Sequence, residues 1–152
     1  MSSTNEEKLK EELAKALEEL QILQANYEVL KNSLDTLVAL LNETRIVKSE
    51  LKTLNEQGEE KELLIPLGTR VLLQAKIKGK PKILYALGAG VLASLPSDEV
   101  DKKLSDFEKK LTDDIAKLQK DIAEILRKIA LTQELAKNLQ NKLMKIIQSR
   151  KS

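Results

Sequence analysis

Apolar residues recur in alternating steps of four and three along this chain, which is the repeat of a helix that packs lengthwise against another helix. We call such a series a seam. The first seam consists of Leu9, Leu13, Ala16, Leu20, Leu23, Tyr27, Leu30, Leu34, Leu37 and Leu41. The second seam follows Pro96 and consists of Val100, Leu104, Phe107, Leu111, Ile115, Leu118, Ile122, Ile125, Ile129, Thr132, Ala136, Leu139, Leu143 and Ile146. The pattern predicts two helices of about 50 residues, each about 75 Å long.

Local signals predict where these helices begin and end. Thr4 and Glu7 have the spacing of a capping box, so the first helix is expected to start at Thr4. Gly58 is a plausible stop for it. Ser97 is expected to cap the second helix, with acidic residues directly after it. The predicted domains are a helix over residues 1–58, an insert over 59–96 and a second helix over 97–152.

The two seams fit each other in one antiparallel register. In this register the position numbers of facing residues add up to 152, so Ala16 faces Ala136 and Leu23 faces Ile129. The same register makes both helices end together. Glutamates are concentrated in residues 1–20 and only bases follow Glu134, so the two ends attract each other, although exposed pairs contribute only about 0 to 1 kcal/mol each. The sequence therefore predicts an intramolecular antiparallel coiled-coil hairpin.

Composition excludes several classes of fold and function. With one Phe, two Tyr and no Trp in 152 residues, the chain has few of the large side chains that fill a compact core. The formal net charge of +2 provides no overall field for nucleic acid or a membrane surface. The chain contains no Cys and no His, which excludes disulfides, thiolate chemistry and imidazole catalysis and argues against zinc sites.

Other motifs also argue against an enzyme or a membrane protein. The glycine-containing stretch "GAGV" lacks the lysine and the spacing of a phosphate-binding loop. With no His and no Cys either, neither cofactor nor metal is expected. No apolar run approaches the roughly 18 residues that span a bilayer. The N-terminal stretch "MSSTNEEKLKEEL" is too polar for a signal peptide. We therefore expect a soluble, cytoplasmic protein without enzymatic activity.

The insert between the helices has the pattern of short strands. Val71, Leu73, Ala75 and Ile77 alternate with other residues, which is the period of a strand. The expected strands are 63–65, 71–77, 83–87 and 91–95, joined as two hairpins by the turns "PLGT" and "GAG". The link between the hairpins carries Lys78, Lys80 and Lys82, which either form an anion patch or keep a strand edge from pairing indiscriminately.

Two short hairpins of this kind cannot satisfy their own edges or bury both faces. The insert is therefore expected to pair with partner chains, closing its edges into β-barrels. The predicted fold class is α+β, a long antiparallel coiled-coil hairpin with two central β-hairpins that oligomerise into a β-barrel platform. The residues expected at this interface are Leu63, Ile65, Val71, Leu73, Ile77, Ile83, Tyr85 and Val91.

The order of these segments resembles the α-class subunit of prefoldin, a cochaperone of archaea and eukaryotes. The resemblance rests on "ELLIPLGTRVLLQAKI", "KILYALGAGVLAS" and "DEVDKKLSDF" between two long helices, and its most specific part is the pair of hairpins. It implies a hexamer of two α-class and four β-class subunits on a double β-barrel. It further implies that the helix tips hold non-native client proteins without ATP and pass them to a group II chaperonin. Some relatives are thought to assemble with themselves.

Two functions remain open at this stage, a chaperone that holds unfolded proteins (a holdase) and a self-assembling structural or filament-forming coiled-coil scaffold. Leu17, Leu131, Met144 and Ile147 lie off the seam near the helix ends, which favours the holdase unless they pack against a neighbour. The residues expected to bind clients are Leu9, Leu13, Leu17, Leu139, Leu143, Met144, Ile146 and Ile147.

Overall fold

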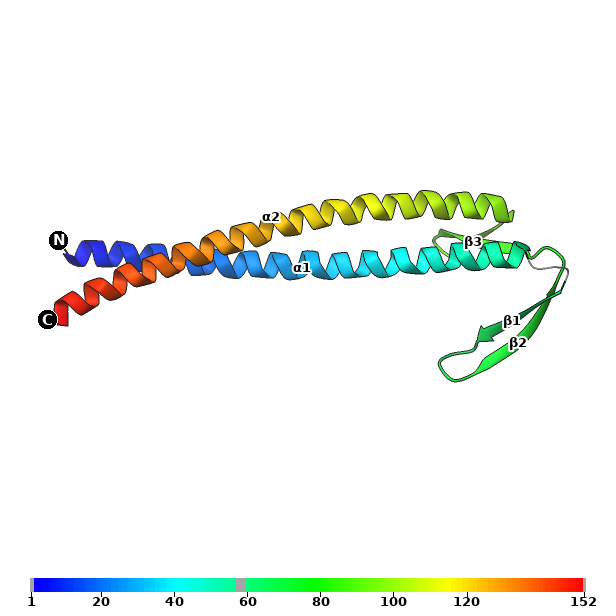
Figure 1. Cartoon of the computed structure of the whole chain (residues 1–152), viewed down its shortest axis with the longest axis horizontal. Helices are drawn as coiled ribbons and strands as arrows, with labels where there is room; N and C mark the ends of the chain where they lie inside the picture. Colours follow the sequence, from blue (N-terminus) through cyan, green and yellow to red (C-terminus); the bar gives the residue numbers. More distant parts are fainter. Residues whose placement is uncertain (1, 57–59, 152) are drawn as a thin grey trace. The chain divides into compact units, whose positions relative to one another are not determined.

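The computed structural model describes residues 2–56 and 60–151. Its elements are helix α1 (Ser2–Glu56), strands β1 (Glu60–Pro66), β2 (Leu72–Lys78), β3 (Ile83–Gly88) and β4 (Val91–Leu95), and helix α2 (Ser97–Lys151) (Figure 1). Two long helices with two antiparallel hairpins between them confirm the predicted fold class at the level of the single chain. No helix in the described ranges is long and apolar enough to cross a membrane.

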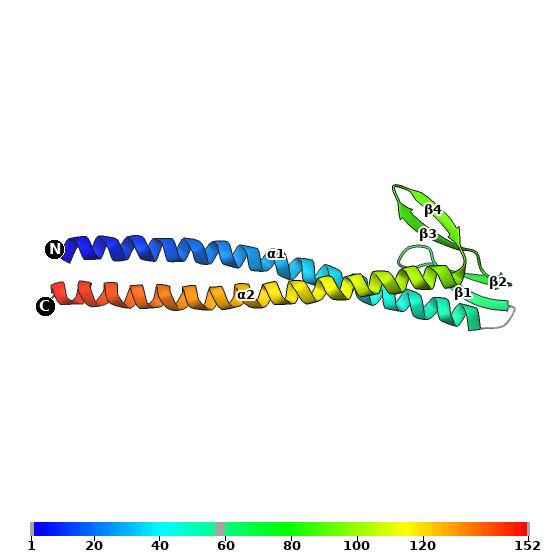
Figure 2. The ribbon, with the colours of Figure 1, turned by 90° about the horizontal axis from the view of Figure 1, so that it is seen from above.

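Contacts along the chain divide it into two compact units. Unit 1 combines the N-terminal part of α1 up to Leu37 with the part of α2 from Asp114 onward, and unit 2 is Val38–Asp113. Both hairpins belong to unit 2, where β1 pairs with β2 and β3 pairs with β4 as two separate sheets (Figures 1 and 2).

The seam residues form the core of unit 1. Ala16, Ala136 and Leu139 make a buried cluster, and Leu9 and Leu13 pack against it. The two ends of the chain lie side by side in both views (Figures 1 and 2). Leu13 and Leu139, like Ala16 and Ala136, are pairs whose numbers add up to 152, so the predicted antiparallel register is confirmed here. The alanine layer lets the helix backbones approach closely because each side chain is a single methyl group.

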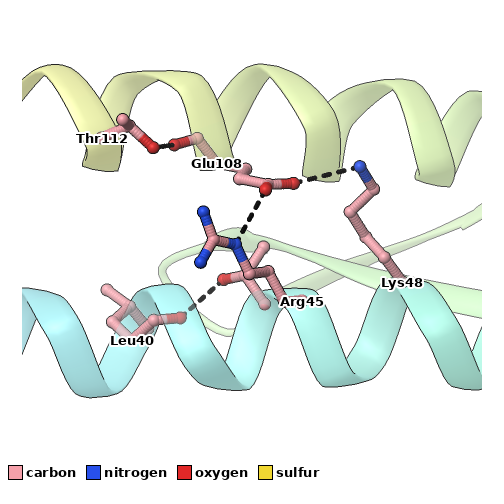
Figure 3. Close-up of polar contacts among 6 residues, drawn as sticks. Leu40, Arg45, Lys48, Glu108 and Thr112 are labelled. Carbon is pink, nitrogen blue, oxygen red and sulfur yellow. Dashed lines mark hydrogen bonds and ion pairs between the residues drawn. The ribbon is translucent and has the colours of Figure 1, made fainter.

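In unit 2 the seam contains a polar layer that the heptad pattern did not predict (Figure 3). Buried Thr44 donates its hydroxyl hydrogen bond to the Leu40 carbonyl at 2.8 Å. Opposite it in the same register, Glu108 accepts a hydrogen bond from Arg45 Nε at 3.0 Å and another from Lys48 Nζ at 3.1 Å. These two hydrogen bonds, from Arg45 first and Lys48 second, lower the pKa of Glu108 below its usual range.

The helix boundaries differ from the prediction at both starts. Helix α1 begins at Ser2, so Thr4 lies inside it and the predicted capping box is wrong. At the second helix, the Pro96 carbonyl accepts hydrogen bonds from the Glu99 and Val100 amides at 3.1 Å, which makes Pro96 the cap and Ser97 the first helical residue. The Ser97 hydroxyl instead accepts a hydrogen bond from Asn55 of α1. The predicted stop at Gly58 lies outside the described residues.

Both predicted hairpins are present, with longer first strands and, in the second hairpin, a shorter turn. Strand β1 extends well beyond the predicted 63–65, and Val71 lies in the turn, where its carbonyl accepts a hydrogen bond from the Leu67 amide at 2.7 Å. In the second hairpin Ala89 and Gly90 have φ of 52° and 76°, the positive values that a two-residue type I′ turn requires. A bulge between Ala86 and Gly88 adjusts the pairing just before this turn.

We expect Glu108→Gln to lower the unfolding temperature at neutral pH and to have little effect in acid. Because the pKa of Glu108 is lower in the folded than in the unfolded chain, its stabilising contribution is complete above the unfolded pKa of about 4.3 and is lost as the pH falls through the folded pKa. Thermal unfolding followed by circular dichroism should therefore show a difference between the two proteins at neutral pH that disappears in acid, once Glu108 is protonated in the folded chain as well.

Glu124→Gln is the matched control for this experiment. Glu124 lies 3.9 Å from Lys128 in an exposed pair within one helix, so its removal should change the unfolding temperature little at any pH. A Glu108→Gln effect of equal size at both pH values would show that the ionised carboxylate is not what stabilises the layer.

Candidate functional site

The ends of the two helices, which we call the tip, are held together by a buried carboxylate. The tip comprises α1 up to Leu17 and α2 from Ala136 onward. Glu6 occupies a seam position, its side chain is 9% exposed, and it forms ion pairs with Arg150 of α2 and, at 3.2 Å, with Lys10 of its own helix. An acidic residue near the start of one helix therefore pairs with a base near the end of the other, as the charge distribution predicted.

The eight residues predicted to bind clients fall into three groups at the tip. Leu139 and Leu143 are buried, at 5% and 6% exposure. Leu9, Leu13 and Ile146 are half-buried. Leu17, Met144 and Ile147 are 47%, 52% and 40% exposed. In the packed tip the third group is exposed to solvent and the second is exposed in part, whereas Leu139 and Leu143 become accessible only where the terminal turns fray.

These three exposed residues lie on one flank of the tip. In a heptad lettered a to g with the seam at a and d, positions b and e lie on one side of the seam and positions c and g on the other. Leu17 and Ile147 are at e positions and Met144 is at b. Reversing one helix brings like letters together, so the three residues share what we call the apolar flank.

The opposite flank of the tip carries a groove with a different character. The groove has a volume of about 410 Å³ and runs between the two helices. Leu9 and Ile146 supply its apolar surface, while the polar residues that line it are Asn5, Lys8, Glu12, Lys142 and Lys145. Lys8 and Lys145 are at c positions and Glu12 and Lys142 at g positions, which places them on the far side of the seam from Met144. The sequence did not predict this groove, because its lysines lie beside Leu9 and Ile146 only once the two helices have paired.

Further exposed apolar residues lie along unit 1 beyond the tip. Among them are Ile22, Val29, Leu126, Leu131 and Leu135, all exposed. A signal for those on α1 was present in the sequence. Between residues 20 and 42, only Glu28, Lys31 and Asp35 are charged, whereas an exposed helix face is normally rich in charge.

The first hairpin presents two distinct faces. Its register pairs Leu63 with Ala75, Ile65 with Leu73 and Lys61 with Ile77, so these six residues share one face. Lys61 is buried, Leu63, Ala75 and Ile77 are half-buried, and Ile65 and Leu73 at the turn end are exposed. The opposite face carries the cross-strand pair Glu62 and Lys76, whose charged atoms lie 3.9 Å apart, together with exposed Leu64 and Leu72.

The second hairpin repeats this arrangement. Ile83 pairs with Leu95 and Tyr85 with Ala93 on a half-buried face, and the Lys103 ammonium of α2 lies 5.9 Å from the centre of the Tyr85 ring. Val91, at the turn end, is exposed. Four leucines on the outer faces of the two hairpins are 59–63% exposed, namely Leu64, Leu72, Leu84 and Leu92.

The tip offers exposed apolar surface, and the two hairpins offer open strand edges. Each sheet has two strands, so every strand has one edge that pairs with nothing within the described part of the chain. In the same residues no group of three or more Asp or Glu side chains is arranged to hold a metal ion. Open strand edges and exposed apolar surfaces are features that favour association with other polypeptides.

Comparison with known proteins assigns the family. A family model described as "Prefoldin subunit" matches residues 23–142, which include most of both helices and both hairpins. This chain belongs to the prefoldin family. A cryo-EM structure of filamentous PFD from Methanocaldococcus jannaschii is similar with a TM-score of 0.64 and 29% identity, covering 74% of this chain and 93% of that one.

Prefoldin alpha subunits are among the curated relatives that match this chain. The prefoldin subunit alpha 1 of Thermococcus kodakarensis is 34% identical over 101 residues, covering 61% of this chain and 69% of that protein. The prefoldin subunit alpha of Pyrococcus horikoshii is 30% identical, with 64% and 69% covered. A putative prefoldin subunit alpha of Aquifex aeolicus is 30% identical, and the match spans 54% of that relative's length. These relatives agree with the resemblance to the α class in the sequence.

We expect Glu6→Gln to increase opening of the terminal turns at the tip without unfolding the coiled-coil hairpin that α1 and α2 form. The substitution removes the charge that Arg150 and Lys10 pair with, and the loss of about 1 kcal/mol corresponds to about fivefold faster amide exchange in the terminal turns. Hydrogen exchange read by mass spectrometry should show this acceleration in residues 2–12 and 140–151 and none around Glu108.

Lys10→Gln is the matched control, because it removes only the partner within the same helix and leaves the pair that joins the two helices. Its effect on exchange in α2 should be smaller than that of Glu6→Gln. Equal exchange in Glu6→Gln and the unchanged protein would show that the apolar seam alone holds the tip closed.

Proposed function

We propose that this chain is a subunit of an ATP-independent chaperone that captures non-native proteins at its helix tip. The observation that carries the proposal is the apolar flank, where Leu17, Met144 and Ile147 stay exposed beside a seam that is already packed. Residues that only connected two ends of a scaffold would be polar at these positions, since exposed apolar side chains favour association. Captured proteins would pass to a group II chaperonin, as the family resemblance implies.

The energy available at one tip fits transient capture. Each exposed Leu, Ile or Met contributes roughly 1.5 to 3 kcal/mol when a partner buries it fully, and less in a partial contact. A single tip therefore binds weakly and releases its client readily. Several tips carried by one assembly raise the apparent affinity by about two to four orders of magnitude without any sequence-specific contact. The unbranched thioether of Met144 suits clients of varied shape.

The same proposal assigns assembly to the hairpins. Their open strand edges and exposed outer leucines support pairing with hairpins of other subunits, which would remove both from water. The expected product is a hexamer of two chains of this α class with four β-class subunits, built on a double β-barrel. The eight interface residues predicted from the sequence all belong to these hairpins or their turns. Capture requires neither nucleotide nor metal. The chain contains no His and no Cys, the side chains that bind zinc most tightly.

The similar structure favours a second candidate, assembly of this chain with itself. That structure is named as a filamentous form, and it covers most of the present chain. A self-assembled scaffold would use the same hairpin edges, so the two candidates differ in partner rather than in surface. The mass of the assembly, measured by light scattering alone and with a β-class subunit, distinguishes them, because a scaffold grows with concentration and a hexamer does not.

We expect Leu73→Asp or Ile83→Asp to dissociate the assembly while leaving helix content nearly unchanged. Each change places a charge on the apolar face of a hairpin, and a charge buried without a partner costs several kcal/mol. Sedimentation should show loss of the oligomer, and circular dichroism should show retained helix. Lys117→Asp, at an exposed position on α2 outside both hairpins, is the control and should still assemble. An unchanged protein that sediments as a single monomer would contradict the assembly proposal.

We expect the joint change of Leu17, Met144 and Ile147 to serine to remove most capture activity from an intact assembly. Losing three apolar contacts of roughly 1.5 kcal/mol or less each weakens a single tip by about two to three orders of magnitude. The measurement is the aggregation of a chemically unfolded protein at equal oligomer concentration, with the mass of the assembly confirmed first. Deleting residues 1–14 and 140–152 should have the same effect.

The control for the tip is the joint change of Ile46 and Val47 to serine. These residues are exposed on α1 and belong to unit 2, whereas the tip belongs to unit 1. Their removal should leave protection unchanged. If the tip variant protects as well as the unchanged protein, clients bind elsewhere on the assembly.

A further inference from the structure

The groove on the second flank of the tip combines apolar and basic side chains in a way that the apolar flank does not. Leu9 and Ile146 supply its apolar surface, and Lys8, Lys142 and Lys145 line it together with the single acid Glu12. All three lysines are exposed. None of them takes part in an ion pair within residues 2–56 and 60–151. Their charge is therefore available to a partner.

The apolar flank differs in degree. Lys10, at an e position on that flank, is engaged with Glu6, whereas Lys137 and Lys151 at b positions there form no ion pair within the described residues. What distinguishes the groove is that its three unpaired lysines lie beside the apolar surface of Leu9 and Ile146. Because the two flanks lie on opposite sides of one seam, a segment bound on one flank does not contact the side chains of the other flank.

We propose that this groove binds segments of non-native clients in which acidic residues adjoin apolar ones. The inference rests on the proposed function and adds a class of client to it. Apolar side chains of the segment would cover Leu9 and Ile146, while its carboxylates pair with the surrounding lysines. Charge complementarity selects this occupant, since a segment flanked by lysines is repelled by Lys8, Lys142 and Lys145 and a neutral one gains nothing from them.

The expected preference is modest and depends on salt. Exposed ion pairs are individually weak, and two or three of them together give about a five- to tenfold tighter binding of an acidic segment than of a neutral one. The preference should fall as salt is raised, because the Debye length shortens from about 10 Å at 0.1 M to about 3 Å at 1 M. Apolar contact alone does not weaken in this way.

The test uses four peptides that carry the same uncharged dye. Three share one core of leucine and isoleucine, flanked by glutamate, glutamine or lysine, and the fourth has the glutamates without the apolar core. Binding to the full-length assembled protein is followed by fluorescence anisotropy at low and high salt. We expect the apolar peptide with glutamate to bind most tightly, and both the lysine peptide and the peptide without a core to bind at least about fivefold more weakly.

Variants then locate the preference. Lys142→Gln with Lys145→Gln should abolish the discrimination between the glutamate and glutamine peptides. Lys117→Gln with Lys120→Gln removes the same charge from exposed positions about 37 Å along the same helix and should leave it intact. Glu12→Gln removes the one acid in the lining and should increase the preference for glutamate, an effect opposite in sign.

Two further outcomes decide the nature of the site. A chemically unfolded, acidic protein should displace the glutamate peptide; failure to displace it would show that the groove serves some other acidic protein rather than a client, and would overturn the proposal. Equal binding of the peptide without a core would also overturn it, because charge alone would then suffice.

If the glutamine peptide binds and aggregation is suppressed but no acidic preference is seen, this inference fails while the proposed function stands. If no peptide binds and no client is protected, the proposed function fails as well.

Discussion

Leucine and isoleucine side chains recur every three or four residues on both helices, and they leave water only by facing each other. Because the hairpins connect the two helices in one chain, the number of residues between a position and the hairpins determines which residue of the other helix faces it. Ala16 with Ala136 in unit 1 and Asn55 with Ser97 in unit 2 obey the same numerical relation, although one contact is apolar and the other polar. At the tip, this register determines on which of the two flanks each exposed residue lies.

Polar residues interrupt the seam where apolar packing would not specify one arrangement. Glu108 with its partners Arg45 and Lys48 occupies one such layer, and Glu6 with Arg150 occupies another at the tip. A slipped register would separate each carboxylate from its partners, whereas leucines would find new leucines. These layers therefore favour a single register, in the way that isolated polar residues do in other coiled coils.

The regular parts of this fold could be predicted from the sequence, and its irregular parts could not. The seams repeat many times, so their helices, their register and the buried alanines were predicted correctly. Glu108 was missed because α2 departs there from the alternation of steps: Phe107, Leu111 and Ile115 follow each other at intervals of four, and a local stutter of this kind brings a neighbouring position to the seam. The cap at Pro96 was missed because the group that accepts the first helical hydrogen bonds is a backbone carbonyl. Every residue has such a carbonyl, so the sequence does not indicate which one acts as the cap.

At the tip, the sequence predicts exposed apolar residues but not the groove. Apolar residues off a seam stand out in a sequence, so the exposure of Leu17, Met144 and Ile147 could be predicted, whereas a lysine on a helix surface looks the same whether it meets solvent or lines a groove. What distinguishes Lys142 and Lys145 is that Leu9 and Ile146 lie beside them, which depends on the pairing of two distant segments. The seam thus leaves both flanks of the tip free. If clients bind at the tip as proposed, substitutions on either flank would alter which segments are held without weakening the packing of the two helices against each other.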